Sequence, residues 1–414
     1  MDETTADVAI VGGGIAGGAL AVQLARAGLA VTVLEHSEEF RDRVRGESMP
    51  PWGYAELMKS NLLEITMRAQ GTVATRVVPY GDSMSPHKAE AAAINTTAIV
   101  PGAAGMLNLS HPSACREMMD AAADGGAKVV RGARRVQVTA GRQPEVTYER
   151  GPREMVVHAQ LIVGADGRNS TVRRQLGIRL ATTGPRTFMV GLLVDGLTGW
   201  PEATNSTGTC EDVAFFIFPR QSGCTRIYLV WDKSNPGRFA GSGAGDRILQ
   251  RLATLTCFPD AEIFRDARPR TGWASFPMED TWSERPYVQG AVLIGDAAGY
   301  SDPILGQGLT VAIRDARLVG DALLREPSWG PKSFEPYAIE RTERMRRLRA
   351  TAEAMTRLRA DFSPDGHRRR DAAFARFAAD PAARLPIAAG LVGPDSLPLE
   401  AFTRDAADRM LALP

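Results

Sequence analysis

The sequence predicts an α/β (α+β) protein in which a parallel-sheet domain is interrupted by an inserted antiparallel sheet and followed by a helical C-terminal cap. Three observations support this fold class. Strand, helix and strand signals alternate around a glycine-rich turn within residues 7–34, as in a βαβ unit. Residues 177–271 contain longer and more aromatic β runs, which are typical of an antiparallel sheet. From Pro331 onward the chain becomes Arg-rich and helical.

Composition limits the classes of partner. A chain of 414 residues is long enough for more than one lobe. Its formal net charge of +1, with acids and bases interspersed, provides no field that would gather nucleic acid or an anionic membrane, so a small-molecule partner is expected. The apolar stretch 8–34 is broken by Gln23, Arg26 and glycines, and the acidic start lacks a signal peptide's basic region. We expect a cytoplasmic protein without stable membrane association, and the sequence leaves its oligomeric state open.

The cysteines are scattered along the chain. They form no CxxC pair and have no histidine partner at metal-ligand spacing. We therefore predict buried free thiols and no metal site. The four residues are Cys115, Cys210, Cys224 and Cys257.

In chain order, the elements divide the protein into three regions. Residues 129–163 contain short β runs separated by Gly, Pro and charged residues, which indicate a meander that returns to the parallel sheet. Residues 291–294 form another apolar strand, which runs into a glycine-rich turn and a helix over about 309–324. The discontinuous first domain is predicted over 1–75, 100–176 and 272–330, the inserted sheet over 76–99 and 177–271, and the helical region over 331–414.

A GxGxxG motif, Gly12-Gly13-Gly14-Ile15-Ala16-Gly17, lies between the first strand and the first helix. Gly12 permits the tight turn, Gly14 lets the backbone approach a pyrophosphate, and Gly17 lets helix and strand pack closely. The helix start supplies unpaired N–H groups for the phosphates. Glu35 ends the next strand at the spacing needed to bind a ribose 2′-hydroxyl, and its charge disfavours the 2′-phosphate of NADP. The segment therefore predicts a Rossmann-like dinucleotide site.

Two later segments share one pattern, an apolar strand followed by a turn that contains aspartate. Residues 161–173 comprise a strand, an Asp166-Gly167 turn and a helix capped by a small polar residue. Residues 292–299 comprise a second strand with Gly295-Asp296 at its end. Together with the glycine motif, these segments strongly resemble the three fingerprints of the para-hydroxybenzoate-hydroxylase family of FAD monooxygenases. Their order and spacing fit over about 320 residues.

The resemblance assigns roles to residues at matching positions. Glu35 would bind the adenosine ribose of FAD, and Asp296 of the Gly295-Asp296 motif would bind the ribityl chain. Asp166 and Gly167 would lie beside the pyrophosphate groove. FAD is expected to be bound non-covalently, because no His or Cys occupies the position that a covalent link requires.

Two more segments match the family. Arg45, in Arg45-Gly46-Glu47-Ser48, takes the place of an arginine near the pyrophosphate, with Arg41 and Arg43 close enough to compete. A segment after Asp296 would direct backbone N–H groups at N1 and O2 of the flavin and stabilise its anionic reduced form. Its matching residues are Pro303, Ile304, Leu305, Gly306, Gln307, Gly308 and Leu309.

Three departures from the family leave the reaction open. Gly299 stands where aromatic hydroxylases usually have His, and glycine there also resembles geranylgeranyl reductases and flavin-dependent halogenases. Residues 272–277 do not match the halogenase string with two tryptophans, whereas Phe218-Pro219 matches the second half of a reductase motif. His111 replaces the family's usual Arg at a helix start, where a His beside Pro is more often a cap than a base.

The resemblance implies an FAD-dependent monooxygenase. NAD(P)H would reduce FAD, and O2 would then form a C4a-hydroperoxyflavin that hydroxylates or epoxidises an aromatic or polyketide-like small molecule. A reductase of C=C bonds, a halogenase and a non-catalytic binding protein are the alternatives. No base for a phenol stands out, and His111, Tyr228 and Trp231 are the catalytic candidates. Aromatic residues in such a sheet are more often part of the core than of a substrate pocket. The aromatic candidates for the pocket are Trp52, Phe216, Phe218, Tyr228, Trp231 and Trp273.

Overall fold

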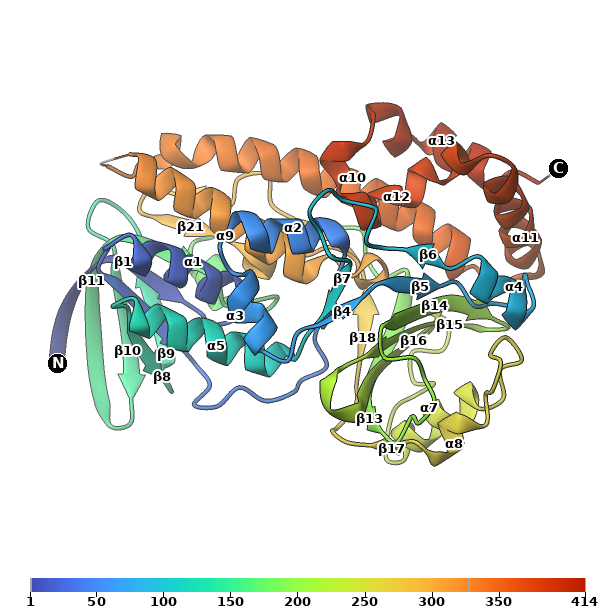
Figure 1. The fold of residues 1–414 in the computed structure, drawn as a ribbon. Coiled ribbons are helices and arrows are strands. Elements are labelled where there is room, and N and C mark those ends of the chain that lie inside the picture. Colours follow the sequence, from blue (N-terminus) through green and yellow to red (C-terminus); the bar gives the residue numbers. More distant parts are fainter. Residues whose placement is uncertain (1, 327, 414) are drawn as a thin grey trace.

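The computed structural model of the protein describes residues 2–326 and 328–413. Met1, Pro327 and Pro414 fall within the predicted domain ranges but lie outside the described residues. One sheet occupies the end of the molecule that contains the N-terminus, and a second sheet occupies the opposite end (Figure 1). A long helix, α10 (Glu335–Arg359), runs from the first sheet domain to the second.

The first sheet is parallel at its centre, as the βαβ signal predicts. Helices cover one face, and the predicted meander of β9 (Arg134–Thr139) and β10 (Glu145–Arg150) covers the other. Burial on both faces explains why its central strands are continuous apolar runs. In order across the sheet, the strands are β20 (Tyr287–Val288), β21 (Ala291–Leu293), β11 (Arg153–Gly164), β1 (Asp2–Val11), β2 (Val31–Glu35) and β8 (Lys128–Arg131).

The strands β1, β2, β11 and β21 run in the same direction, so their carboxyl ends meet at one edge of the sheet. The three predicted motifs follow three of these strands, and the sheet therefore brings them together. Between β1 and β2, the glycine-rich first helix packs against α5 (His111–Asp124) and α9 (Gly308–Arg325). The helices of this domain are α1 (Ile15–Arg26), α2 (Pro51–Lys59), α3 (Leu63–Arg68), α5 (His111–Asp124), α6 (Thr171–Gln175) and α9 (Gly308–Arg325).

The second sheet is largely antiparallel, and its residues alternate between two apolar clusters, one on each face. Its last strand, β18, begins at Ala274, so the inserted sheet extends beyond residue 271, the predicted boundary. The strands in order are β17 (Arg268–Pro269), β13 (Thr187–Asp195), β16 (Cys224–Asp232), β15 (Val213–Pro219), β14 (Thr204–Cys210), β5 (Arg76–Val78) and β6 (Ile94–Asn95), with β18 (Ala274–Met278) beside β13.

Two small sheets and several helices complete the fold. The small sheets comprise β3 (Ser48–Met49), β7 (Met106–Asn108) and β4 (Thr72–Ala74), and β12 (Ala181–Thr182) with β19 (Thr281–Trp282). The remaining helices are α4 (Pro86–Ala91), α7 (Ala244–Leu252), α8 (Ile263–Asp266), α11 (Pro364–Ala379), α12 (Leu385–Val392) and α13 (Arg404–Met410). The 3-10 turns are η1 (Gln221–Gly223), η2 (Gly295–Ala298), η3 (Pro303–Leu305), η4 (Pro331–Phe334), η5 (Pro381–Arg384), η6 (Pro394–Ser396) and η7 (Leu399–Phe402).

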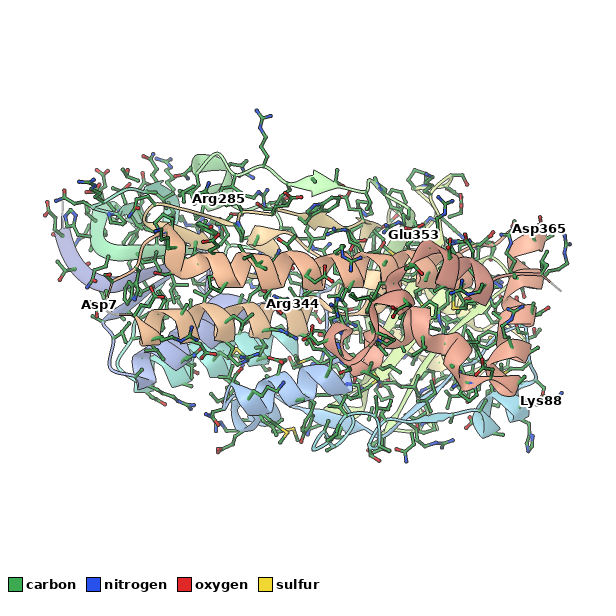
Figure 2. All side chains as sticks on the ribbon, turned by 90° about the horizontal axis from the view of Figure 1, so that it is seen from above. Asp7, Lys88, Arg285, Arg344, Glu353 and Asp365 are labelled. Atoms are coloured by element: carbon green, nitrogen blue, oxygen red, sulfur yellow. The ribbon has the colours of Figure 1, made fainter. Side chains whose placement is uncertain are left out.

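The C-terminal region is helical, as predicted, but it does more than cover the fold. Arg344 and Glu353 mark the course of α10 in the view from above, and Asp365 lies beyond its end (Figure 2). The first half of α10 contacts the turn after β21, and the second half packs on the second sheet. Over the described ranges, no helix has both the length and the apolar character that a membrane span needs. The four cysteines are buried and free.

Candidate functional site

The turn between β1 and α1 is held by close backbone packing. Gly12 has φ +108°, and a Cβ atom on it would lie 2.4 Å from the carbonyl oxygen of Ala165. A Cβ on Gly17 would lie 1.9 Å from the carbonyl oxygen of Gly12, so α1 approaches β1 this closely only with glycine there. A Cβ on Gly14 would meet no atom within 4 Å. The turn therefore leaves open space next to Gly14, on the side where a pyrophosphate is expected.

Glu35 ends β2 beside this turn and has a fixed orientation. Its Oε2 accepts a hydrogen bond from the N–H of Gly13 at 2.7 Å, and its Oε1 accepts one from the N–H of Ser37 at 2.7 Å. Each carboxylate oxygen can accept a further hydrogen bond. The geometry of Glu35 therefore fits a ribose hydroxyl as donor.

The Asp166-Gly167 turn follows β11. Oδ2 of Asp166 accepts hydrogen bonds from the N–H groups of Thr171 at 2.7 Å and Val172 at 3.1 Å, so it binds the first N–H groups of α6, whose N-cap residue is Ser170. Oδ1 of Asp166 is buried, and within the described ranges it has no hydrogen-bond partner. Gly167 has φ +78°, and Nη1 of Arg45 lies 3.8 Å from the place where its Cβ would be. The fold therefore brings Arg45 to the turn that the sequence assigns to the pyrophosphate.

The loop that carries Arg45, between β2 and β3, contacts the second sheet. Arg41, Arg43 and Arg45 are all exposed, and among the described residues Arg41 pairs with exposed Glu39, so the approach of Arg45 to Gly167 is what distinguishes it from the competing candidates. The carbonyl oxygen of Arg45 accepts a hydrogen bond from Oη of Tyr228 on β16 at 2.7 Å. Tyr228 thus positions the Arg45 loop from the second sheet.

Charged residues that the sequence analysis did not assign hold the Gly295-Asp296 turn. Asp315 on α9 accepts a hydrogen bond from the N–H of Gly295 at 2.8 Å. Arg341 on α10 donates to three carbonyl oxygens of the turn at 2.7 to 3.2 Å and pairs with Asp315 at 2.8 Å. Arg344 pairs with the other oxygen of Asp315 at 2.6 Å. Burial alone would raise the pKa of Asp315, but the two arginines hold it below its ordinary value.

Asp296 itself stays accessible at the end of β21. Its carboxylate is about a quarter exposed, and its Oδ2 lies 3.4 Å from Nε of Arg168. The Arg168 guanidinium lies 4.6 Å from the ring centroid of Tyr300, a cation–π contact. Asp296 is therefore free to accept a hydrogen bond from a bound hydroxyl, as the ribityl assignment requires.

The segment from η3 to the start of α9 has two open glycines. Gly306 has φ +66°, and neither Gly306 nor Gly308 would bring a Cβ within 4 Å of another atom. Pro303 opens η3, and Leu309 is buried at the start of α9. Because the first N–H groups of a helix lack partners within it, this segment can supply donors to a flavin edge. Together with the open space at Gly14, the segment fits a flavin dinucleotide.

Two sets of polar contacts fix the position of the segment from η3 to the start of α9. Asp302 accepts a hydrogen bond from the N–H of Ile304 at 3.0 Å, and it shares Arg186 with Asp280. Burial raises the pKa of Asp302 to about 6. Trp52 donates from Nε1 to Oε1 of Gln307 at 2.8 Å, which ties α2 to the segment.

A buried ion-pair cluster joins the Arg45 loop to the second sheet. Oε1 of Glu47 accepts a hydrogen bond from Arg220 at 2.9 Å, and its Oε2 accepts one from Arg226 at 2.8 Å. Asp42 also pairs with Arg226 at 2.5 Å. The sequence pattern predicted no role for Glu47. The sequence contained a signal, since Arg226 is a charged residue directly before the largely apolar run 227–231.

The three catalytic candidates differ in their surroundings. Burial, followed by Arg45, lowers the pKa of His111 to about 3, and its Nδ1 lies 3.7 Å from Sγ of Cys115. Burial raises the pKa of Tyr228, which keeps its phenol protonated. Trp231 packs in the apolar cluster on the face of the second sheet opposite to Tyr228, and its Nε1 donates to the carbonyl oxygen of Asn235. None of the three has the environment of a general base near neutral pH.

The aromatic pocket candidates divide between the two faces of the second sheet. Trp231 and Trp273 pack in the cluster behind it, so they do not line a pocket on the front. Phe216, Phe218 and Tyr228 belong to the cluster on the face toward α10. The sheet's front face therefore carries an aromatic wall.

Comparison with known proteins gives a consistent result. The model of the family described as "FAD binding domain" matches residues 5–352. The 3-demethoxyubiquinol 3-hydroxylase of Escherichia coli is 26% identical over 361 residues, which cover 84% of this chain and 87% of that protein. The menaquinone reductase of Mycolicibacterium smegmatis is 28% identical over 351 residues, with 77% and 76% covered. The crystal structure of P. aeruginosa PqsL in complex with 2-aminobenzoylacetate is 21% identical, with a TM-score of 0.75, and covers 90% of this chain and 100% of that one.

Proposed function

The chain belongs to the FAD-binding-domain family, and from this premise we propose that it is a monooxygenase that hydroxylates or epoxidises an aromatic or polyketide-like small molecule. NAD(P)H is the proposed reductant and O2 the co-substrate. One observation carries the proposal: three turns that suit FAD meet at one sheet edge, and the aromatic wall of the second sheet packs in one cluster with Ile304 and Leu305 of the segment before α9. The hydroxylase relative supports the same reaction class.

Bound FAD would accept electrons from NAD(P)H and activate O2. The chain's own residues bind and orient it: Glu35 at the ribose, Arg45 at the pyrophosphate and Asp296 at the ribityl chain. The helix start after Gly306 places donors where negative charge develops. The apolar wall excludes water from the reacting atoms. The cytoplasmic location and the absence of a nucleic-acid or stable membrane partner stay predictions.

A reductase of C=C bonds is the second candidate, and a relative named a menaquinone reductase supports a reductive reaction. Gly299, the residue that raised this alternative, has a structural explanation. Its φ is +114°, and a Cβ there would lie 2.5 Å from the carbonyl oxygen of Thr281. The local backbone thus requires glycine whichever reaction occurs, and Gly299 does not distinguish the two.

The test is isotope incorporation. The FAD-loaded protein is supplied with NAD(P)H, ¹⁸O₂ and a panel of phenols, aromatic acids and isoprenoid alkenes, and products are analysed by mass spectrometry. A monooxygenase yields a product that contains one ¹⁸O atom. A product with two added hydrogens and no ¹⁸O, formed equally well without oxygen, supports the reductase instead.

A further inference from the structure

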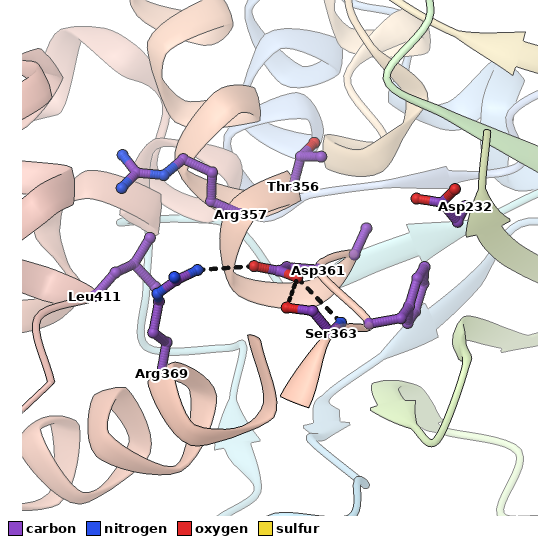
Figure 3. A pocket seen from close by; sticks show the side chains of 9 residues that line it. Asp232, Thr356, Arg357, Asp361, Ser363, Arg369 and Leu411 are labelled. Atoms are coloured by element: carbon purple, nitrogen blue, oxygen red, sulfur yellow. Dashed lines mark hydrogen bonds and ion pairs between the residues drawn. The ribbon is translucent and has the colours of Figure 1, made fainter. Parts of the chain in front are cut away.

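Two cavities of the protein differ in how their charges are paired. The first has a volume of about 530 Å³, lies at the end of α10 and is lined by two arginines and two aspartates. Arg369 pairs with Asp361 at 2.9 Å, and Asp361 also accepts a hydrogen bond from Ser363 (Figure 3). Arg357 pairs with Asp408 at 2.7 Å. The charges of this cavity are compensated within the protein, so it gives no reason to expect a charged ligand.

The second cavity, which we call the arginine cavity, has an excess of positive charge. Its volume is about 480 Å³, which is within the range of small-molecule sites. Three of its lining residues are arginines and one is acidic. A cavity lined mainly by one sign of charge concentrates the electric field and attracts counter-ions. The lining residues are Glu38, Arg131, Gly132, Arg134, Arg150 and Gly151.

Neighbouring acids do not neutralise these arginines. Glu149 lies opposite Arg134 in the pairing of β9 and β10, but its carboxylate pairs with Arg135 at 2.9 Å. Across the described residues, the exposed side chains of Arg134 and Arg150 take part in no ion pair and no hydrogen bond. Arg131 makes one long contact of 3.7 Å, with exposed Asp120. The arginine cavity therefore suits an anion that the chain itself does not supply.

The arginine cavity adjoins the residue assigned to the adenosine ribose of FAD. Arg131 is the partner of Glu35 in the register of β2 and β8. The N–H of Ala133 donates to the carbonyl oxygen of Glu35 at 3.0 Å. A Cβ on Gly132 would lie 3.2 Å from Cγ of Glu38, so the loop after β2 lies against the turn after β8. An anion in this cavity would therefore lie near the adenosine end of the proposed FAD site.

The residues of the arginine cavity favour a phosphate group as the anion. The planar guanidinium matches two oxygens of a phosphate and binds them with charge-assisted hydrogen bonds. The sequence has one GxGxxG motif, which the proposed FAD site uses, so a nicotinamide nucleotide needs another way to have its phosphates bound. FAD and NADPH both carry ADP at one end and a redox-active ring at the other. An NADPH molecule with its adenosine end beside that of FAD therefore directs its nicotinamide toward the flavin end.

We propose that the arginine cavity binds the 2′-phosphate of NADPH, which NADH lacks, and that NADPH is the reductant of this protein. The inference rests on the proposed function and names the reductant for it. NADPH gives a hydride to FAD and leaves as NADP⁺. The arginines take no part in this transfer and act as specificity-determining residues for the reductant.

The experiment follows reduction of the FAD-loaded protein without oxygen or substrate, so its outcome does not depend on oxygen transfer. Rapid mixing with a range of NADPH or NADH concentrations gives the Kd of each nucleotide from the loss of flavin absorbance. The variants are Arg134→Gln and Arg150→Gln, and the control is Arg142→Gln. Arg142 is exposed in the turn between β9 and β10 and does not line the cavity. Thermal unfolding and FAD content show that each variant is folded and loaded.

The wild-type protein should bind NADPH about tenfold more tightly than NADH, because charge-assisted hydrogen bonds to the 2′-phosphate are made only with NADPH. Arg134→Gln and Arg150→Gln should each raise the Kd for NADPH by about fivefold and leave the Kd for NADH unchanged. Arg142→Gln should change neither value. As a probe of the phosphate group, 2′-AMP should compete with NADPH more strongly than 5′-AMP or inorganic phosphate does.

Three results overturn the inference: equal binding of NADPH and NADH by the wild type, equal weakening of both nucleotides in the variants, or no reduction by NADPH. Loss of FAD from folded Arg134→Gln or Arg150→Gln also overturns it, because the cavity would then belong to the FAD site. If inorganic phosphate competes as strongly as 2′-AMP, the cavity binds free anions and the assignment to NADPH fails. If the NADPH preference depends on the arginines but no ¹⁸O enters any product, the reductant assignment stands and the monooxygenase assignment fails.

Discussion

The two glycine turns of the candidate FAD site are built in different ways. The turn after β1 depends on contacts between near neighbours, since Gly17 packs on Gly12 and Glu35 bonds to Gly13. The Gly295-Asp296 turn after β21 depends on Asp315, Arg341 and Arg344, which come from two later helices. Close backbone packing at glycines holds the turn after β1, whereas buried ion pairs hold the turn after β21.

This difference indicates which kind of substitution should disturb each turn. A glycine turn is disturbed by added atoms, because its close contacts leave no room. A turn held by buried ion pairs is disturbed by removal of one partner, because the remaining charge is left without compensation. The two turns should therefore respond to opposite kinds of substitution.

The largest effect is expected from Arg341→Met. This change removes three hydrogen bonds to the turn and leaves buried Asp315 with one arginine fewer. We expect the free energy of unfolding to fall by about 3–5 kcal/mol, the cost of breaking a buried pair. Urea unfolding of the apoprotein measures it. Arg346→Met, which breaks an exposed pair on the same helix, should change stability by less than about 1 kcal/mol. Equal effects of the two substitutions would show that the buried charges do not hold the turn.

A smaller effect is expected at the first turn, where two alanine substitutions separate packing from binding. Gly17→Ala would bring its Cβ to 1.9 Å from the Gly12 carbonyl oxygen, so unfolding should become easier by about 1–3 kcal/mol. Gly14→Ala meets no atom, so apoprotein stability should hold while FAD affinity falls. Urea unfolding and FAD titration give the two values. Loss of stability in Gly14→Ala, or normal stability in Gly17→Ala, would contradict this division.

The same contrast explains what the sequence could predict. The turn after β1 is local, so glycine spacing and strand signals were enough to place Gly12, Gly14, Gly17 and Glu35 at one turn. The βαβ pattern also predicted that the first two strands, β1 and β2, lie parallel in one sheet. These features depend on residues close together in the chain.

The second turn could not be predicted as fully. Its Gly-Asp motif was visible, but Asp315 and Arg341 lie 20 and 46 residues from Gly295 and look like ordinary residues of charged helices. Only the packing of α9 and α10 shows that they are buried. In the same way, the two faces of the second sheet separate Trp231 from Tyr228, which composition alone cannot reveal.

The smallest predicted effect concerns pH. The pKa of Asp302 is raised from 3.8 to about 6, so between these values the folded state binds more protons than the unfolded state. The stability contributed by this group therefore rises as the pH falls from 7 through 6. Relative to Asp302→Asn, the wild type should gain about 1 kcal/mol between pH 7 and pH 5. Parallel stability curves for the two proteins would show that burial does not perturb Asp302.

The central claim is that the two turns hold opposite ends of one FAD molecule, and comparing ADP with FAD tests it directly. Calorimetric titration of the apoprotein gives both affinities for the wild type, Glu35→Gln and Asp296→Ala. Glu35→Gln should weaken ADP and FAD alike, by about 1–3 kcal/mol for a lost charge-assisted hydrogen bond. Asp296→Ala should weaken FAD by a similar amount and leave ADP unchanged. If Asp296→Ala weakens ADP as much as FAD, or alters neither affinity, the two turns do not share one FAD in the way proposed.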